Sequence, residues 1–113
     1  MKIELKLKSM QIHYLAAKLE ILSIASVKEI INLPRERKAV YSILLPVADK
    51  MAKKHIEIQR STHLFNDKKA HKISFKYHEA HALNLMLTYD VESDVRYAHI
   101  FNTINGMLDQ KLL

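Results

Sequence analysis

The chain contains no cysteine and no tryptophan, and it has one glycine and two prolines among 113 residues. Without cysteine there is no disulfide framework, no thiolate nucleophile and no cysteine-ligated metal site. The single glycine, Gly106, excludes a glycine-rich phosphate-binding loop. It also argues against an all-β fold, because hairpin turns use glycine freely. These absences favour a small helix-rich protein without thiol or dinucleotide chemistry.

Long hydrophobic runs are also missing. No run approaches the roughly 18 apolar residues that cross a bilayer, and residues 1–8 lack the apolar stretch of a signal peptide. We therefore expect a soluble, cytoplasmic protein with no membrane partner. The length predicts a single domain over residues 1–113, and a hydrophobic fraction of 49% supplies a core for it.

Two stretches alternate apolar with polar residues, which is typical of half-buried strands. They are residues 2–8 and 72–77, and each runs directly into a helical pattern. Strands this short need a partner, so we expect them to pair as a two-stranded ribbon, with antiparallel pairing favoured. The residues predicted to face the core are Ile3, Leu5, Leu7, Ile73, Phe75 and Tyr77.

Apolar residues at helical spacing predict helices over 10–24 and 35–60, and two more after residue 77. The Ser26–Glu29 capping box predicts a short helix over 27–32, and Glu92 with Asp94 opens the last helix. Residues 61–71 are predicted to be a loop between halves 1–60 and 72–113. The expected fold is thus mostly α (α+β), with four to five helices and the short ribbon. Its two longest stripes are Ile12, Leu15, Leu19 and Leu22, widened by Tyr14, Ile21 and Ile24, then Val40, Leu44, Val47, Met51, His55 and Ile58.

The two halves share an order of elements. Lys2-Ile-Glu-Leu-Lys and Lys72-Ile-Ser-Phe-Lys are similar at an offset of 70 residues, and each precedes a helix. This pattern predicts a β-α-α / β-α-α internal pseudo-repeat, in which pairing of the strands brings their outward lysines together.

The net charge of +6 is unevenly distributed. Residues 50–76 carry eight basic and two acidic side chains, whereas residues 77–113 carry two basic and five acidic ones. Lysines outnumber arginines by 14 to 4, which favours contact with phosphates over reading of bases, because arginine is the better bidentate partner of guanine. The predicted nucleic-acid-binding residues are Lys50, Lys53, Lys54, Arg60, Lys68, Lys69, Lys72, Lys76, Lys2, Lys6 and Lys8.

Catalytic and metal-binding motifs are not found in the sequence. No serine lies in a Gly-x-Ser-x-Gly context, and His78-Glu-Ala-His81 differs from the zinc-binding His-Glu-x-x-His pattern. We therefore predict no enzymatic activity, no catalytic residue, no metal and no cofactor. Among the seven histidines we expect His81 to be partly buried, with His63, His71 and His78 exposed.

Residues 2–32 and 72–108 each resemble the strand-helix-helix order of the ribbon-helix-helix repressors. The resemblance implies a tandem, single-chain DNA-binding protein whose ribbon enters the major groove. The chain departs from that pattern in its mostly lysine outward residues and in the insert 35–60. It departs also in Glu92 and Asp94, which would repel phosphate at a helix start.

As a whole, the chain also resembles the small proteins of phages and mobile elements, particularly anti-CRISPR inhibitors. The likeness lies in one small domain, no catalytic motif, no cysteine, polarised charge and a composition rich in Lys, Ile and Leu. It implies a non-enzymatic inhibitor that contacts RNA or an RNA-guided nuclease complex, and this is our first functional hypothesis, ahead of the repressor. A helical protein-interaction or toxin–antitoxin module is a further alternative, and a homodimer stays open.

Overall fold

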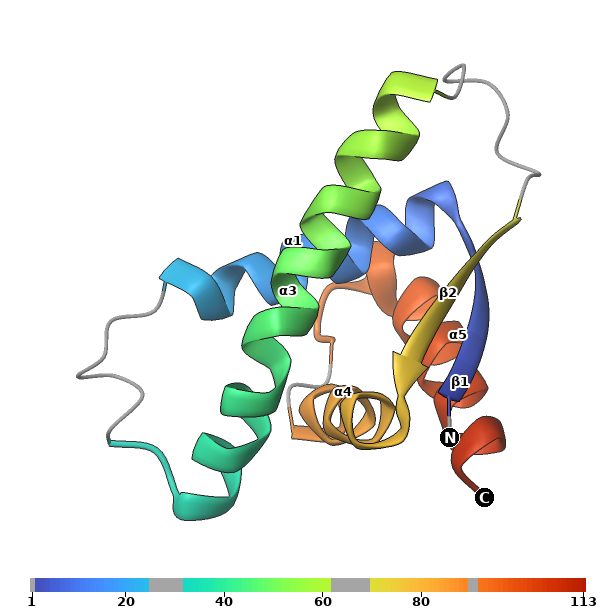
Figure 1. Ribbon diagram of the computed structural model, residues 1–113. Helices are drawn as coiled ribbons and strands as arrows, with labels where there is room; N and C mark the ends of the chain where they lie inside the picture. Colours follow the sequence, from blue (N-terminus) through green and yellow to red (C-terminus); the bar gives the residue numbers. More distant parts are fainter. Residues whose placement is uncertain (1, 25–31, 62–69, 90–91) are drawn as a thin grey trace.

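A computed structural model describes residues 2–24, 32–61, 70–89 and 92–113 of the chain. These residues form four helices and a two-stranded antiparallel sheet, which confirms the mostly helical α+β fold (Figure 1). The helix predicted over 27–32 lies almost wholly outside the described residues, as do its capping box and most of the predicted loop 61–71. The elements in chain order are β1 (Lys2–Lys8), α1 (Ser9–Ile24), α3 (Arg35–Ser61), β2 (Ala70–Lys76), α4 (Tyr77–Tyr89) and α5 (Val95–Leu112).

The ribbon has one buried and one exposed face, as its alternation predicts. In β1 every second side chain is buried, and β2 contributes Ile73 and Phe75 to the same face. The prediction was wrong for Tyr77, which is 46% exposed. Strand β2 begins at Ala70 and ends at Lys76, so Tyr77 is the first residue of α4 and no longer follows the strand's alternation.

The antiparallel pairing relates the two strands by a local two-fold axis. Both strands have seven residues, and their middle residues, Leu5 and Ile73, lie directly opposite each other. The strands therefore begin 68 residues apart, and the offset of 70 predicted from the sequence was wrong by two. A shift of two residues keeps every side chain on its face, so alternation alone could not find the correct offset.

The described helices of the two halves make corresponding helix–helix contacts. Helix α3 packs on α1 as α5 packs on α4, and the cross-contacts α3–α4 and α1–α5 correspond in the same way. The order β-α-α / β-α-α is thus present in the described elements. However, the long helix predicted as an insert is, among the described elements, the helix that follows α1 in the first half.

Both strands pass into their helices through equivalent hydrogen bonds. The backbone N–H of Lys8 donates to the Gln11 side chain, and the backbone N–H of Lys76 donates to the Glu79 side chain, both at 2.8 Å. Each acceptor lies three residues after the last strand residue, as in a capping box. These bonds end the strands at 68-residue spacing and start α1 and α4 without a loop.

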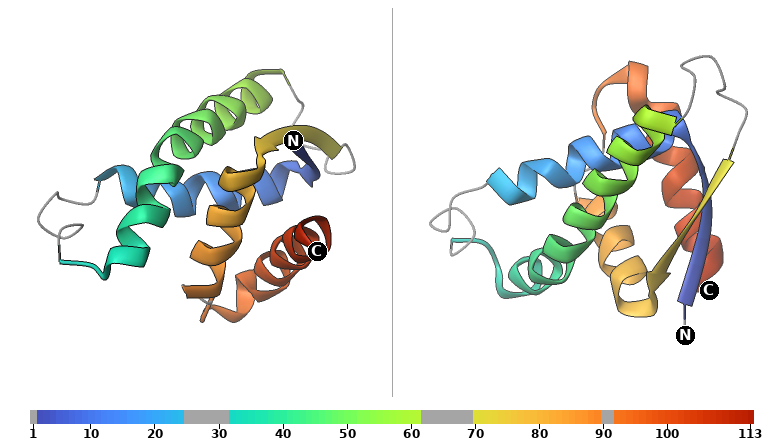
Figure 2. Two further views of the ribbon diagram at one scale, coloured as in Figure 1. Left: turned by 60° about the horizontal axis from the view of Figure 1, so that its bottom comes forward. Right: turned by 45° about the horizontal axis from the view of Figure 1, so that its top comes forward.

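All four helices lie on one side of the ribbon, so the opposite face of the sheet faces outward (Figure 2). Buried side chains from all six elements form one continuous core. In α1 the predicted stripe is buried at Ile12, Leu15 and Leu19, and the side chain of its fourth member, Leu22, lies outside the described ones. Of the residues predicted to widen the stripe, Tyr14 is buried, whereas Ile21 is 58% exposed. In α3 five of the six predicted positions are buried and His55 is half-buried.

The start of α5 differs from its prediction. Asp94 is the N-cap residue, and its side chain accepts a hydrogen bond from the backbone N–H of Arg96. Glu92 does not belong to the helix, which begins at Val95, and its carboxylate lies 2.7 Å from Lys18 Nζ of α1. The residue instead joins the two halves of the protein.

Among the helices that the structure describes, none has the length and apolar character of a membrane span.

Candidate nucleic-acid interface

The outward face of the ribbon is the most basic surface formed by the two strands. Its exposed side chains include five lysines and one carboxylate, Glu4. All the lysines come from the alternate positions of the two strands that the core does not use. They are Lys2, Lys6, Lys8, Lys72 and Lys76.

Two pairs of these lysines lie directly opposite each other across the strands. Lys2 is opposite Lys76, and Lys6 is opposite Lys72. Like charges in this position destabilise a sheet, and a two-stranded ribbon has little stability of its own. Packing of the core therefore offsets the repulsion between the opposed lysines. Fold stability by itself does not explain why lysines occupy these positions.

The charge pattern does not follow the two-fold axis. At the spacing of 68 residues, Lys6 corresponds to Ser74 and Glu4 corresponds to Lys72. Only Lys8 and Lys76 are equivalent lysines. The backbone of the interface is nearly symmetric, whereas its side chains are not.

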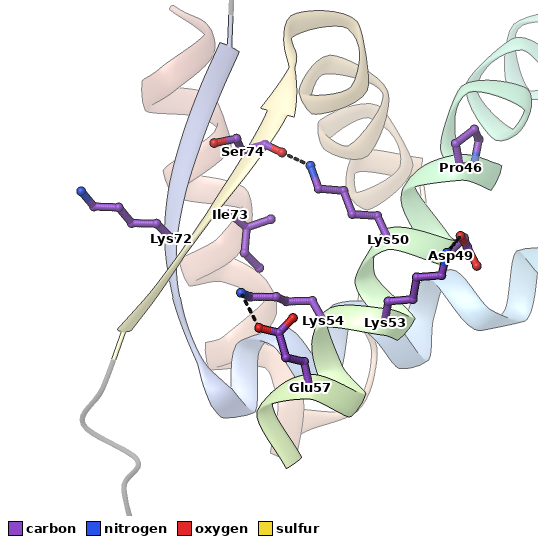
Figure 3. A pocket seen from close by; sticks show the side chains of 9 residues that line it. All are labelled: Pro46, Asp49, Lys50, Lys53, Lys54, Glu57, Lys72, Ile73 and Ser74. Carbon is purple, nitrogen blue, oxygen red and sulfur yellow. Dashed lines mark hydrogen bonds and ion pairs between the residues drawn. The ribbon is translucent and has the colours of Figure 1, made fainter. Parts of the chain in front are cut away.

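A groove of about 510 Å³ lies between α3 and β2, beside the ribbon (Figure 3). Lys50 and Lys54 extend from α3 toward β2, while Lys72 points away from α3. Two exposed ion pairs lie at its α3 wall: Lys53 Nζ is 3.0 Å from Asp49 Oδ2, and Lys54 Nζ is 3.7 Å from Glu57 Oε1. Exposed pairs of this kind contribute little to stability, so these two lysines can exchange their partners.

Lys50 has a different role from its neighbours. Its ammonium group donates to the backbone carbonyl of Ser74 on the outer edge of β2, and it lies 5.0 Å from the centre of the Phe75 ring. An unpaired strand edge is otherwise free to pair with another chain. Lys50 therefore connects α3 to the edge of the ribbon.

The structure divides the predicted site residues into two groups and leaves two of them outside. Five lysines lie on the outward ribbon face, and Lys50, Lys53 and Lys54 lie along α3. Arg60 is exposed in the last turn of α3. Lys68 and Lys69 lie outside the described residues.

The histidines are arranged differently from the prediction. His81 is exposed and its ring stacks on Tyr77, with 6.4 Å between centroids, because Tyr77 and His81 are one helical turn apart. His71 is half-buried, since it lies within β2 rather than in a loop. His78 is exposed as expected, and His63 lies outside the described residues.

A pair of histidines that the sequence did not reveal connects α1 and α3. His13 Nδ1 and His55 Nε2 share a hydrogen bond of 3.1 Å, at the wall of a cavity of about 450 Å³ that Glu20 and Asp49 also line. Burial and then the nearby His13 lower the pKa of His55. The residues are 42 positions apart, so only the packing of α1 on α3 brings them together.

A second polar contact joins α1 to the start of α5. Glu92 pairs with Lys18, and Lys18 also lies 5.6 Å from the centre of the Tyr14 ring. Burial and the neighbouring Glu92 carboxylate raise the pKa of the Tyr14 hydroxyl above its usual range. This partly buried cluster joins α1 to the start of α5 and stabilises the fold.

Within the four described stretches, no three His, Asp or Glu side chains are grouped closely enough to hold a metal ion. Comparison with known proteins gives no match to a family model, to a curated protein sequence or to a solved structure. We therefore infer function from the arrangement of the ribbon and α3.

Proposed function

We propose that the protein binds double-stranded DNA by placing the outward face of the β1–β2 ribbon in the major groove, without catalysing a reaction. The observation that carries this proposal is the set of five lysines on one ribbon face, two pairs of which oppose each other. A nearby row of phosphates neutralises charges that otherwise repel. Lysines on short strands also discourage edge pairing, and the test below separates that role from binding.

The dimensions of the ribbon agree with this ligand. Seven residues per strand give a length of about 20 Å at the usual rise per residue. The major groove of B-DNA is about 12 Å wide and admits a two-stranded ribbon. The deep, narrow major groove of A-form RNA does not admit side chains in this way, so the shape of the interface favours DNA over duplex RNA.

The charges suggest contact with the DNA backbone and little reading of sequence. Lysine is a compact point charge that neutralises phosphates but does not form the bidentate contacts of arginine. The asymmetry of the side chains implies that the preferred site need not be palindromic.

The test measures binding of a fluorescent duplex by anisotropy over a series of KCl concentrations. We expect tight binding at low salt and a steep loss of affinity as salt rises, because phosphate contacts release counterions. Lys6→Gln/Lys72→Gln removes one opposed pair and lowers the magnitude of the log–log salt slope by about 1.8. A flat salt dependence for the wild-type protein would exclude phosphate contact.

The control removes the same two charges elsewhere. Arg35→Gln/Lys38→Gln changes two exposed side chains in the first turn of α3, at the end of that helix away from the ribbon (Figure 1). If it weakens binding as much as Lys6→Gln/Lys72→Gln, only total charge matters and the ribbon assignment fails. Circular dichroism checks that both variants keep the helical fold.

The inhibitor hypothesis stays a prediction, and the same assay tests it. A protein that acts on a guide RNA or its nuclease binds single-stranded or structured RNA in preference to the DNA duplex. Equal-length duplex DNA, duplex RNA and single-stranded RNA probes are therefore measured in parallel. Preference for RNA would overturn the DNA proposal and favour the inhibitor hypothesis.

A further inference from the structure

We infer that the groove between α3 and β2 holds one phosphate backbone of the bound duplex, with Lys53 and Lys54 as its phosphate contacts. The inference rests on the proposed function and adds a second contact surface to it. Because β2 is a strand of the ribbon, the groove lies along one flank of the surface proposed to enter the major groove (Figure 3). A ribbon inside the major groove of DNA has one phosphate backbone of the duplex on each of its two flanks.

The two lysines already lie at this flank. Their partners are Asp49 and Glu57 of the same helix, at 3.0 and 3.7 Å. The side chains of Lys53, Asp49 and Glu57 are mostly exposed, at 77%, 68% and 68%, and that of Lys54 is half-buried at 31%. Water therefore screens both pairs on their carboxylate side, and a phosphate can replace the carboxylate. Such charge-assisted contacts with phosphate are strong because the oxygen acceptors are ionised.

Lys50 maintains the groove rather than contacting the ligand. Its ammonium group is held by the Ser74 carbonyl and lies over the Phe75 ring. This contact fixes the separation of α3 and β2 and so the width of the groove. Lys53 and Lys54 are then the α3 lysines available to contact a phosphate in the groove.

The flank on the other side of the ribbon carries fewer basic side chains. Helix α5 contacts β1 there. Its basic residues are Arg96 and Lys111, and Arg96 is paired with Asp94 at 2.8 Å. The groove wall of α3 instead presents Lys50, Lys53 and Lys54.

The test compares Lys53→Gln/Lys54→Gln with the wild-type protein in the duplex anisotropy assay. We expect the variant to keep DNA binding through the ribbon, with affinity lowered about tenfold or more and a salt slope smaller in magnitude by about 1.8. The opposite change, Asp49→Asn/Glu57→Gln, removes the competing carboxylates. It should tighten binding and keep a steep salt dependence.

The outcomes separate this inference from the proposed function. If the wild-type protein does not bind the duplex, the proposed function and this inference both fail. If Lys6→Gln/Lys72→Gln weakens binding while Lys53→Gln/Lys54→Gln behaves like Arg35→Gln/Lys38→Gln, the ribbon proposal stands and the groove assignment is overturned. Unchanged or weaker binding by Asp49→Asn/Glu57→Gln also contradicts the groove assignment, provided that circular dichroism shows an intact fold.

Discussion

The only glycine of the chain lies in the middle of a helix. Gly106 is exposed within α5, its φ angle is not positive, and a methyl group added there meets no atom within 4 Å. Glycine at such a position lowers helix stability because its unfolded backbone has more freedom to lose. Nothing in its surroundings requires this residue type.

We predict that Gly106→Ala raises the free energy of unfolding by about 0.5–1 kcal/mol. Urea denaturation measures it as a higher midpoint with an unchanged slope. Gln110→Ala, at another exposed position of the same helix, is the control and changes stability by less than about 0.5 kcal/mol. A lower free energy of unfolding for Gly106→Ala would contradict the regular helical conformation of α5 at this residue.

At the scale of elements, the passage from strand to helix depends on one side-chain acceptor in each half. Glu79 accepts the backbone N–H of Lys76. We predict that Glu79→Ala lowers the free energy of unfolding by about 0.5–1.5 kcal/mol, the usual net value of one hydrogen bond. Glu79→Gln keeps an oxygen acceptor and retains most of that stability, so equal losses in both variants would contradict the capping role.

The histidine pair makes the contact between α1 and α3 sensitive to pH. The pKa of His55 is lower in the folded protein than the value of about 6.5 for an unfolded histidine. The unfolded chain therefore binds more protons as pH falls, and folding loses stability. The contribution of the pair is fully present above about pH 6.5 and is lost as pH falls through the lower, folded pKa.

We expect the Tm of the wild-type protein to fall between neutral and mildly acidic pH, with a smaller fall for His55→Gln. The comparison is made in buffers of constant ionic strength. His99→Gln, which removes an exposed histidine of α5, is the matched control and keeps the wild-type pH dependence. Parallel curves for the wild-type protein and His55→Gln would show that the pair does not couple proton binding to folding.

At the scale of the whole molecule, the Leu5–Ile73 pair holds the two halves together. Both side chains are buried and lie opposite each other at the approximate two-fold axis. We predict that Leu5→Ala lowers the free energy of unfolding by about 2–5 kcal/mol, as is usual for a buried leucine. The control is Ile21→Ala, at an exposed apolar position, which changes the free energy of unfolding by less than about 0.5 kcal/mol. An equally small change for Leu5→Ala would contradict the burial of the ribbon in the core.

The sequence by itself determined the elements. Alternation at period two and apolar spacing at period 3.6 depend only on neighbouring residues, so the two strands, the long helix α3 and the outward lysines of the ribbon could be predicted. The predicted boundaries of two helices were wrong. Tyr77 continues the alternation of β2 but belongs to α4, and Glu92 resembles a helix start but pairs with Lys18.

The tertiary structure decided what lies beside what. The repeat offset follows from the strand ends at Lys8 and Lys76, which pass into α1 and α4 through equivalent hydrogen bonds, and the His13–His55 pair follows from the packing of α1 on α3. The sequence predicted a basic cluster over residues 50–76, but only the position of α3 beside β2 separates the groove lysines from the ribbon lysines. Periodicity is a local property of the chain, whereas the histidine and groove contacts join residues more than 20 positions apart and depend on how the whole core packs.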